Sequence, residues 1–326
     1  MKKMLIVLVV LTLVLTGFAA QGSQDSIVIC SMLDQERNEM LQEQLSEAFP
    51  GQEIIVTYMS TGKAAAKVFT EGENTEIDIL LSMESGYLNK IQEYLADISG
   101  ISTIPYLEEF APAANHNKWI TWEKFAGAFV INPQVLKKHG AEAPRTYADL
   151  LKPQYKDLLA MPDPKSSGTG YFFYKSWVNT WGIDQTLEYV DALYENMKQL
   201  TDSGNGPTKL LKQGEIGVGL GMTFQAMNEI NNGQPLEIIF PETGSPYSLA
   251  GTAMIRGREQ NPEVRAVFEF LANDFFVYDK EHYSPDTIYQ GQINKVPNYP
   301  QNIVYADMNG IQDDQEKERL LALWKY

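Results

Sequence analysis

Hydroxyl and glycine residues in five loops are the part of this sequence best suited to bind a small molecule. Each loop directly follows a predicted strand, and four of the five carry serine or threonine at or near the start of a predicted helix. The loops comprise residues 31–33, 60–63, 82–85, 163–170 and 221–225. This placement brings hydroxyls and backbone amides together.

The chemistry available at such helix starts is anion binding. The first N–H groups of a helix have no partner within it, and the helix dipole makes that end partly positive. Serine and threonine hydroxyls add donors, and glycine lets a ligand approach the backbone. The result is an anion site that needs no basic residue. Ordinary helix capping uses the same residue types and stays open as the alternative for each loop.

An alternation of short apolar strands and amphipathic helices must position these loops. In the first third of the chain, strands are predicted over residues 26–30, 53–58 and 77–81, and helices over 33–49, 62–71 and 86–95. This alternation predicts a mainly parallel sheet covered by helices. Ligands of open α/β sheets bind beyond the carboxyl ends of the strands, which is where the five loops lie.

The rest of the chain repeats the alternation, without an internal repeat or a low-complexity segment. Further strands are predicted over 119–121, 126–131, 158–161, 216–220, 236–240 and 250–255. Further helices are predicted over 133–139, 147–151, 168–181, 184–199, 208–213, 224–231, 262–273 and 312–324. Such a chain is long enough for two α/β domains or one large one.

Catalytic motifs are missing from the sequence. It contains no Gly-x-Ser-x-Gly elbow and no His-Glu-x-x-His zinc motif, and Gly217-x-Gly219 lacks the later glycine of a dinucleotide fingerprint. The three histidines, His116, His139 and His282, lie in polar turns or at a helix end and are expected on the surface. We therefore expect no enzyme activity, no metal site and no cofactor.

The N-terminus has the three-part layout of a secretory signal. Lys2 and Lys3 precede an uncharged apolar run over residues 4–16, and small residues follow at 17–20. We expect cleavage of residues 1–20 and export to the periplasm or another extracytoplasmic space. The alternative is an uncleaved anchor, although the apolar stretch is at the short end of the range that spans a bilayer.

The strong negative charge excludes some partners. The formal net charge is −16, and loss of Lys2 and Lys3 with the signal would leave −18. An acidic surface argues against binding to nucleic acid or to anionic lipid. Cys30 is the single cysteine, which rules out an internal disulfide, and it is expected to be buried as a small apolar residue.

Ordered landmarks over nearly all of the mature chain resemble a known family. They begin with Ser60-Thr61-Gly62, Ile77-Asp78-Ile79-Leu80, Phe129-Val130-Ile131-Asn132-Pro133 and Pro144-Arg145-Thr146-Tyr147-Ala148-Asp149-Leu150. They continue with residues 152–157, 163–170, 214–219 and 241–247. The chain resembles bacterial periplasmic solute-binding proteins of ABC transporters, in the group of ferric-ion, sugar-phosphate, aminoethylphosphonate, thiamine and polyamine binders.

The resemblance implies an α/β fold with two lobes, the type II periplasmic binding protein fold. Each lobe would be a mainly parallel sheet flanked by helices. Lobe one would hold residues 24–128 and 250–326, with the tail free to pack on both lobes, and lobe two residues 129–249. Crossing strands near 129–132 and 249–253 would form a hinge that closes on the ligand. A monomer would then deliver its small-molecule solute to the inner-membrane permease of an ABC importer.

The resemblance also suggests a ligand class. Ferric-binding members carry adjacent tyrosines after the strand that follows the Gly-Glu turn, where this chain reads Met222-Thr223-Phe224-Gln225. The loops at 60–62 and 166–169 match instead those that related binders place around phosphate or phosphonate. We predict a small anionic solute such as a sugar phosphate, with ferric ion or an iron chelate as the alternative. A secreted hydrolase and a chemoreceptor or adhesion module are the other classes left open.

The predicted ligand-binding residues come from the five loops and from two later positions. Glu242 and Gln225 would exchange hydrogen bonds with hydroxyl or amino groups of the ligand, and Tyr247 would line the cleft. The full set is Ser31, Ser60, Thr61, Gly62, Ser82, Glu84, Ser166, Ser167, Gly168, Thr169, Thr223, Gln225, Glu242 and Tyr247.

Overall fold

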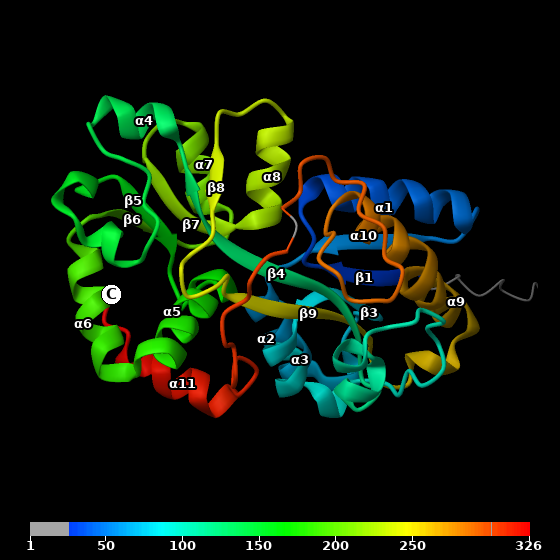
Figure 1. The fold of residues 1–326 in the computed structure, drawn as a ribbon. Coiled ribbons are helices and arrows are strands. Elements are labelled where there is room, and N and C mark those ends of the chain that lie inside the picture. Colours follow the sequence, from blue (N-terminus) through cyan, green and yellow to red (C-terminus); the bar gives the residue numbers. More distant parts are fainter. Residues whose placement is uncertain (1–25, 301) are drawn as a thin grey trace, which may run out of the picture.

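The computed structural model describes residues 26–300 and 302–326, which form two α/β halves side by side (Figure 1). Nine strands make one mixed sheet in the order β2-β1-β3-β9-β4-β7-β5-β6, and β8 pairs with β4 off this path. The strands are β1 (Ile27–Ser31), β2 (Ile54–Tyr58), β3 (Ile79–Glu84), β4 (Ile120–Ile131), β5 (Leu159–Pro162), β6 (Met197–Thr201), β7 (Val218–Met222), β8 (Glu237–Ile239) and β9 (Tyr247–Met254).

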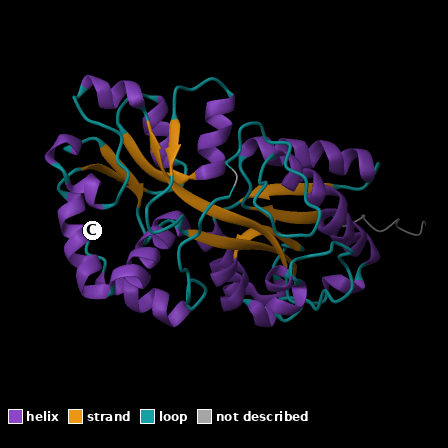
Figure 2. Cartoon of the chain, viewed as in Figure 1, coloured by secondary structure: helices purple, strands orange, loops and turns teal. Residues whose placement is uncertain are grey.

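Helices flank the sheet in both halves (Figure 2). They are α1 (Gln35–Ala48), α2 (Thr61–Glu71), α3 (Ser85–Lys90), α4 (Pro133–Lys138), α5 (Gly168–Trp181), α6 (Ile183–Tyr194), α7 (Gly206–Lys212), α8 (Thr223–Asn231), α9 (Pro262–Phe270), α10 (Phe276–His282) and α11 (Asp314–Leu323). Most coincide with predicted helices to within a few residues, because their apolar positions recur at helical spacing.

Two long antiparallel strands, β4 and β9, join the halves (Figure 1). Residues 120–126 of β4 pair with β9, whereas residues 127–131 pair with β7. The sequence predicts two separate strands here, and this prediction is wrong. Glu123 interrupts the apolar pattern but stays within the strand, because it forms a buried ion pair with Arg37 at 2.9 Å.

Each half has its own apolar core. The core of lobe one comes mainly from residues 27–122 and 254–289, and the core of lobe two from residues 129–227 and 296–324. We call the half built on the first core lobe one and the half built on the second core lobe two. The C-terminal tail crosses between the lobes once more, since its residues after Val296 pack in the core of lobe two.

The helix predicted over residues 184–199 is two elements in the structure. Helix α6 ends at Tyr194, and β6 begins at Met197. The side-chain amide of Asn196 donates hydrogen bonds to the carbonyls of Leu150 and Lys152, at 2.8 and 2.9 Å. The following residues then pair in parallel with β5. Tertiary pairing here outweighs the helical pattern of the sequence.

The helix predicted to end at residue 273 continues further. A π-helical stretch (Leu271–Phe275) connects α9 to α10, which the sequence does not predict. Asp279 and Lys280 lie fully buried on α10. The predicted helix over 147–151 is a short 3-10 turn (Ala148–Leu151).

The predicted signal at residues 1–20 lies outside the described residues. In residues 26–300 and 302–326, no helix combines the length and apolar composition that a bilayer crossing requires. Cys30 is buried as predicted, and its burial raises the pKa of the thiol to about 12.

Candidate functional site: an interlobe cleft

A cleft of about 430 Å³ lies where the two lobes meet. Lobe one lines it with the loops that follow β1, β2 and β3, and lobe two lines it with the starts of α5 and α8 and residues 202–205. Ten of the fourteen predicted ligand-binding residues line this cleft. They are Ser60, Thr61, Gly62, Ser82, Glu84, Ser166, Ser167, Gly168, Thr169 and Gln225.

The start of α2 contributes hydroxyls and free first-turn amides from lobe one. Ser60 is the N-cap residue, with extended backbone angles of φ −67° and ψ 146°. Within the described part of the chain, its side chain makes no capping hydrogen bond to the helix. Thr61 and Gly62 follow in the first turn, whose amides have no acceptor inside the helix. These donors are therefore available to a ligand.

The start of α5 contributes the matching group from lobe two. Ser167 is its N-cap residue and, among residues 26–300 and 302–326, makes no side-chain capping bond either. The helix begins with Gly168, Thr169 and Gly170. A Cβ atom on Gly170 would lie 2.3 Å from the carbonyl oxygen of Pro162, so only glycine lets α5 start this close to the end of β5.

Several other helices use their N-cap side chains, whereas α6, α7, α8 and α10 do not. Asp34, Asn132 and Asn261 each accept a hydrogen bond from a first-turn amide of α1, α4 and α9, respectively. Asp313 does the same for α11. The capping alternative therefore does not account for Ser60 and Ser167, whose helices face the cleft.

Helix α8 supplies a third group at the cleft. The Gln225 side chain donates through Nε2 to Asn205 Oδ1, and its Oε1 has no hydrogen-bond partner in the described residues. This oxygen can accept a hydrogen bond from a ligand hydroxyl or amino group. Phe125 and Phe224 add apolar surface beside it, with ring centroids 6.1 Å apart.

The floor of the cleft in lobe one is a buried charge cluster that the sequence does not predict. Arg37 donates through Nε and one terminal nitrogen to both oxygens of Asp279, each at 2.8 Å. The same guanidinium contacts Glu123 at 2.9 Å, and Lys280 contacts Asp279 at 3.1 Å. Arg37 and Glu123 line the cleft. We call these four residues the floor cluster.

Within the floor cluster, Arg37 and Asp279 hold each other ionised. Burial alone would lower the pKa of Arg37, but Asp279 and Glu123 raise it above its usual value. Burial alone would raise the pKa of Asp279, but Arg37 and Lys280 lower it. Two positive and two negative charges thus compensate each other, which is the condition for keeping charges inside a protein.

Ser82 connects the floor cluster to the hinge. Its backbone has φ +59°, a conformation that non-glycine residues seldom adopt. Its hydroxyl donates to Glu123 Oε1, and its amide donates to the Thr252 hydroxyl at 3.2 Å. Strained residues of this kind cluster at binding sites, where the surrounding structure holds them in place.

A sequence signal for Arg37 exists. It lies four residues from Leu33 and from Leu41, both of which are buried, so a charged residue occupies the apolar face of the predicted helix. Such a residue must find a partner when it is buried. The partner, Asp279, is 242 residues away in the chain, in a helix that the sequence does not predict.

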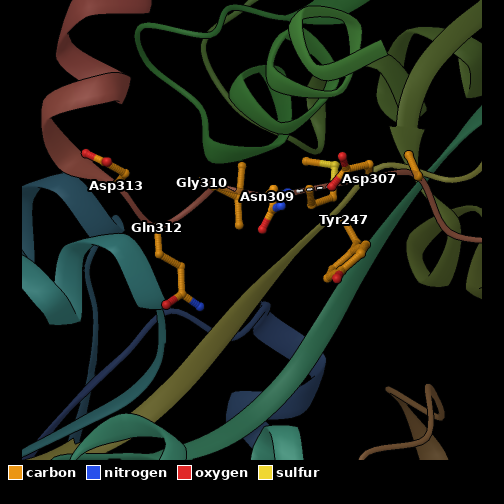
Figure 3. A pocket seen from close by; sticks show the side chains of 9 residues that line it. Tyr247, Asp307, Asn309, Gly310, Gln312 and Asp313 are labelled. Carbon is orange, nitrogen blue, oxygen red and sulfur yellow. Dashed lines mark hydrogen bonds between the residues drawn. The ribbon is translucent and has the colours of Figure 1, made fainter.

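Four of the predicted residues lie outside the lining of the cleft. Ser31 is buried and accepts a hydrogen bond from the Leu33 amide at 3.2 Å. The Glu242 carboxylate accepts from the Tyr147 amide, and Thr223 is fully buried. Tyr247 instead lines a different pocket of about 420 Å³, formed with residues 306–313 of the tail (Figure 3).

Formal side-chain charge does not make the cleft basic. Lys63 and Lys165 lie exposed at its rim, while Asp34 and Asp202 offset them. In the part of the chain that the structure describes, no group of three or more histidine, cysteine, aspartate or glutamate residues is placed to hold a metal ion. The helix starts are therefore the main positive features of the cleft.

Comparison with known proteins shows which family this chain matches. Residues 75–279 match the sequence model of a family described as bacterial extracellular solute-binding protein. An uncharacterized protein of Haemophilus influenzae is 28% identical over 261 residues, which cover 75% of this chain and 73% of that protein.

Solved structures share the fold at low sequence identity. The periplasmic binding protein P5PA has a TM-score of 0.79 and 22% identity, covering 92% of this chain and 98% of its own. AfuA from Actinobacillus pleuropneumoniae, solved with exogenous fructose-6-phosphate bound, has a TM-score of 0.80 and 22% identity, covering 93% and 98%. Iron-bound HitA from Pseudomonas aeruginosa has a TM-score of 0.73 and 14% identity, covering 91% and 97%. These likenesses confirm the predicted type II periplasmic binding protein fold.

Proposed function

Because the chain belongs to the family of bacterial extracellular solute-binding proteins, we propose that it captures a small solute bearing a phosphate or phosphonate group and delivers it to an ABC importer. The observation that carries this proposal is the convergence of two uncapped helix starts, α2 and α5, on one cleft from opposite lobes. An anion held between them would join the lobes and favour closure.

The physical basis is donation from neutral groups. Each helix start offers first-turn amides and the positive end of its dipole, and Ser60, Thr61, Ser167 and Thr169 add hydroxyl donors. A phosphate group has enough acceptor oxygens to bond both helix starts at once. The floor cluster is already neutral, so it does not supply a free countercharge.

The remainder of the solute would meet a mixed surface. Gln225 lines the cleft and its Oε1 has no hydrogen-bond partner in the described residues, while Phe125, Phe172 and Phe224 provide apolar faces. A sugar ring suits this combination, since it presents hydroxyls at its edge and C–H groups on its faces. The fructose-6-phosphate in AfuA is a solute of this kind and lends support from a protein of the same fold.

A ferric ion is less well supported as cargo. The iron-bound HitA shares the fold, but residues 222–225 of this chain carry no tyrosine, and no metal-binding group of the kind described above occurs in the described residues.

We propose further that the protein acts outside the cytoplasm after removal of its N-terminal signal. We also propose that it acts as a monomer and binds its solute without catalysis.

The proposal is tested with the purified mature protein. Native mass spectrometry would detect a solute that remains bound through purification, and its mass would give its class. Calorimetry would then compare glucose 6-phosphate with glucose, which differ only in the phosphate group. We expect binding of the phosphorylated sugar and weaker or no binding of glucose. Equal affinity for the two sugars, or a bound metal ion without an organic anion, would overturn the proposal.

A further inference from the structure

Helix α11 places a buried lysine between the two lobes. The helix itself is attached to lobe two: its Leu320 carbonyl accepts a hydrogen bond from the Tyr174 hydroxyl at 3.2 Å, and Glu316 pairs with Lys175 at 2.7 Å. Leu320 and Trp324 also pack in the core of that lobe. Figure 1 shows α11 beside α5 and close to α3 of lobe one.

Lys317 of α11 reaches across to lobe one. Its Nζ lies 3.4 Å from Glu84 Oε2, and the lysine is only 8% exposed. The ammonium also lies over two aromatic rings, 4.3 Å from the centroid of Tyr87 in lobe one and 4.9 Å from that of Tyr171 in lobe two. Burial lowers the pKa of Lys317, but Glu84 and Tyr87 raise it overall, so the side chain stays charged.

Glu84 lies beside the proposed anion site. Its Oε1 accepts from the Gly86 amide at 3.1 Å and from the Ser248 hydroxyl at 3.3 Å. Its Cγ is 3.9 Å from the position that a Cβ on Gly168 would occupy, at the start of α5. A carboxylate without a countercharge at this place would repel an incoming anion and would itself occupy the positive end of the helix dipole.

We infer that Lys317 determines the charge specificity of the cleft: it neutralises Glu84 across the lobe boundary and so leaves the start of α5 to an anionic solute. This inference rests on the proposed function. Because the lysine comes from lobe two and the carboxylate from lobe one, the neutralising contact forms only when the lobes are together.

The test uses the mature protein and three compounds that share the glucose ring but differ in charge: glucose 6-phosphate, glucose and glucosamine. In Lys317→Met, calorimetry should show affinity for glucose 6-phosphate lowered about tenfold or more, while affinity for the cationic glucosamine does not fall. The double variant Glu84→Gln/Lys317→Met should recover most of the lost affinity. Glu84→Gln alone should bind glucose 6-phosphate more tightly than the wild type does.

A matched control separates charge from helix packing. Lys90→Met removes an exposed contact between α3 and α11, that of Lys90 with Glu318 at 3.7 Å, and should leave all three affinities unchanged. If the wild type binds glucose 6-phosphate and Lys317→Met binds it equally well, this inference is overturned but the proposed function is not. A loss that Glu84→Gln does not reverse would also overturn it. A wild type that binds no glucose 6-phosphate would overturn the proposed function and this inference with it. Glu84→Gln keeps the test decisive if Lys317→Met does not fold.

Discussion

The floor and the walls of the cleft differ in the charge of their side chains and in whether their polar groups are already paired. The floor cluster consists of four full charges that are buried and engaged with one another. The walls, at the starts of α2 and α5, carry serine, threonine and glycine, and their donors are not used for capping. The floor cluster therefore stabilises the structure, whereas the neutral helix starts keep donors for a ligand.

The largest effect expected from this contrast is on stability. Asp279→Asn leaves the buried Arg37 guanidinium without its main partner, so we expect the free energy of unfolding to fall by about 3–5 kcal/mol. Urea denaturation of the mature protein measures it. Arg265→Gln breaks an exposed ion pair with Glu269 and serves as the control, with no measurable change expected. A small loss in Asp279→Asn would show that the floor cluster does not hold structure.

The pH dependence of stability sharpens the same contrast. Because the pKa of Asp279 is lower in the folded than in the unfolded state, its stabilising contribution is complete above pH about 4 and is lost as the pH falls through the folded pKa. The difference in unfolding free energy between the wild type and Asp279→Asn should therefore shrink below pH about 4. A difference that stays constant down to pH 2 would contradict the assignment.

A substitution in the wall formed by the start of α5 should have an intermediate effect, on the free energy of ligand binding and not on stability. Thr169→Ala removes a hydroxyl donor at the start of α5 and should weaken glucose 6-phosphate binding by about 1–3 kcal/mol, measured by calorimetry. Thr180→Ala, at the other end of the same helix, removes a hydroxyl that donates to the Ser176 carbonyl and should leave binding unchanged. Equal affinity in the two variants would remove Thr169 from the site.

The smallest effect should have opposite signs for folding and binding. Gly62 lies in the first turn of α2, and a Cβ there would meet only the Tyr87 side chain, with the hydroxyl oxygen nearest at 3.7 Å. Gly62→Ala should therefore raise the unfolding free energy by about 0.4–1 kcal/mol. It should weaken glucose 6-phosphate binding, because the methyl group keeps the anion from the backbone. Unchanged or tighter binding would show that the ligand does not approach α2.

The walls could be predicted from sequence, and the floor could not. Ser60-Thr61-Gly62 and Ser166 to Thr169 are local patterns, and each lies between a strand and a helix that its own residues predict. Arg37 and Asp279 are in contact although 242 residues separate them in the sequence. Local spacing carries no information on a contact between residues so far apart in the sequence.

Strand β4 and the C-terminal tail also could not be predicted correctly from local sequence. Glu123 made β4 look like two strands, because a charge inside a buried strand is understood only once its partner is known. Lys317 belongs to a charge-rich tail that resembles a solvated surface in the sequence, yet the lysine is buried between the lobes. Contacts between the tail and lobe one depend on how the lobes are arranged, and composition does not determine that arrangement.

NMR can observe the backbone amides of both walls while the ligand binds. In a ¹H–¹⁵N NMR titration of the mature protein with glucose 6-phosphate, the amide protons of Gly62 and Gly168 should both shift downfield, with the same midpoint. Glucose should leave them in place. If only one of the two glycines responds, or if neither does while the phosphorylated sugar binds, the two helix starts do not share an anion and the account is wrong.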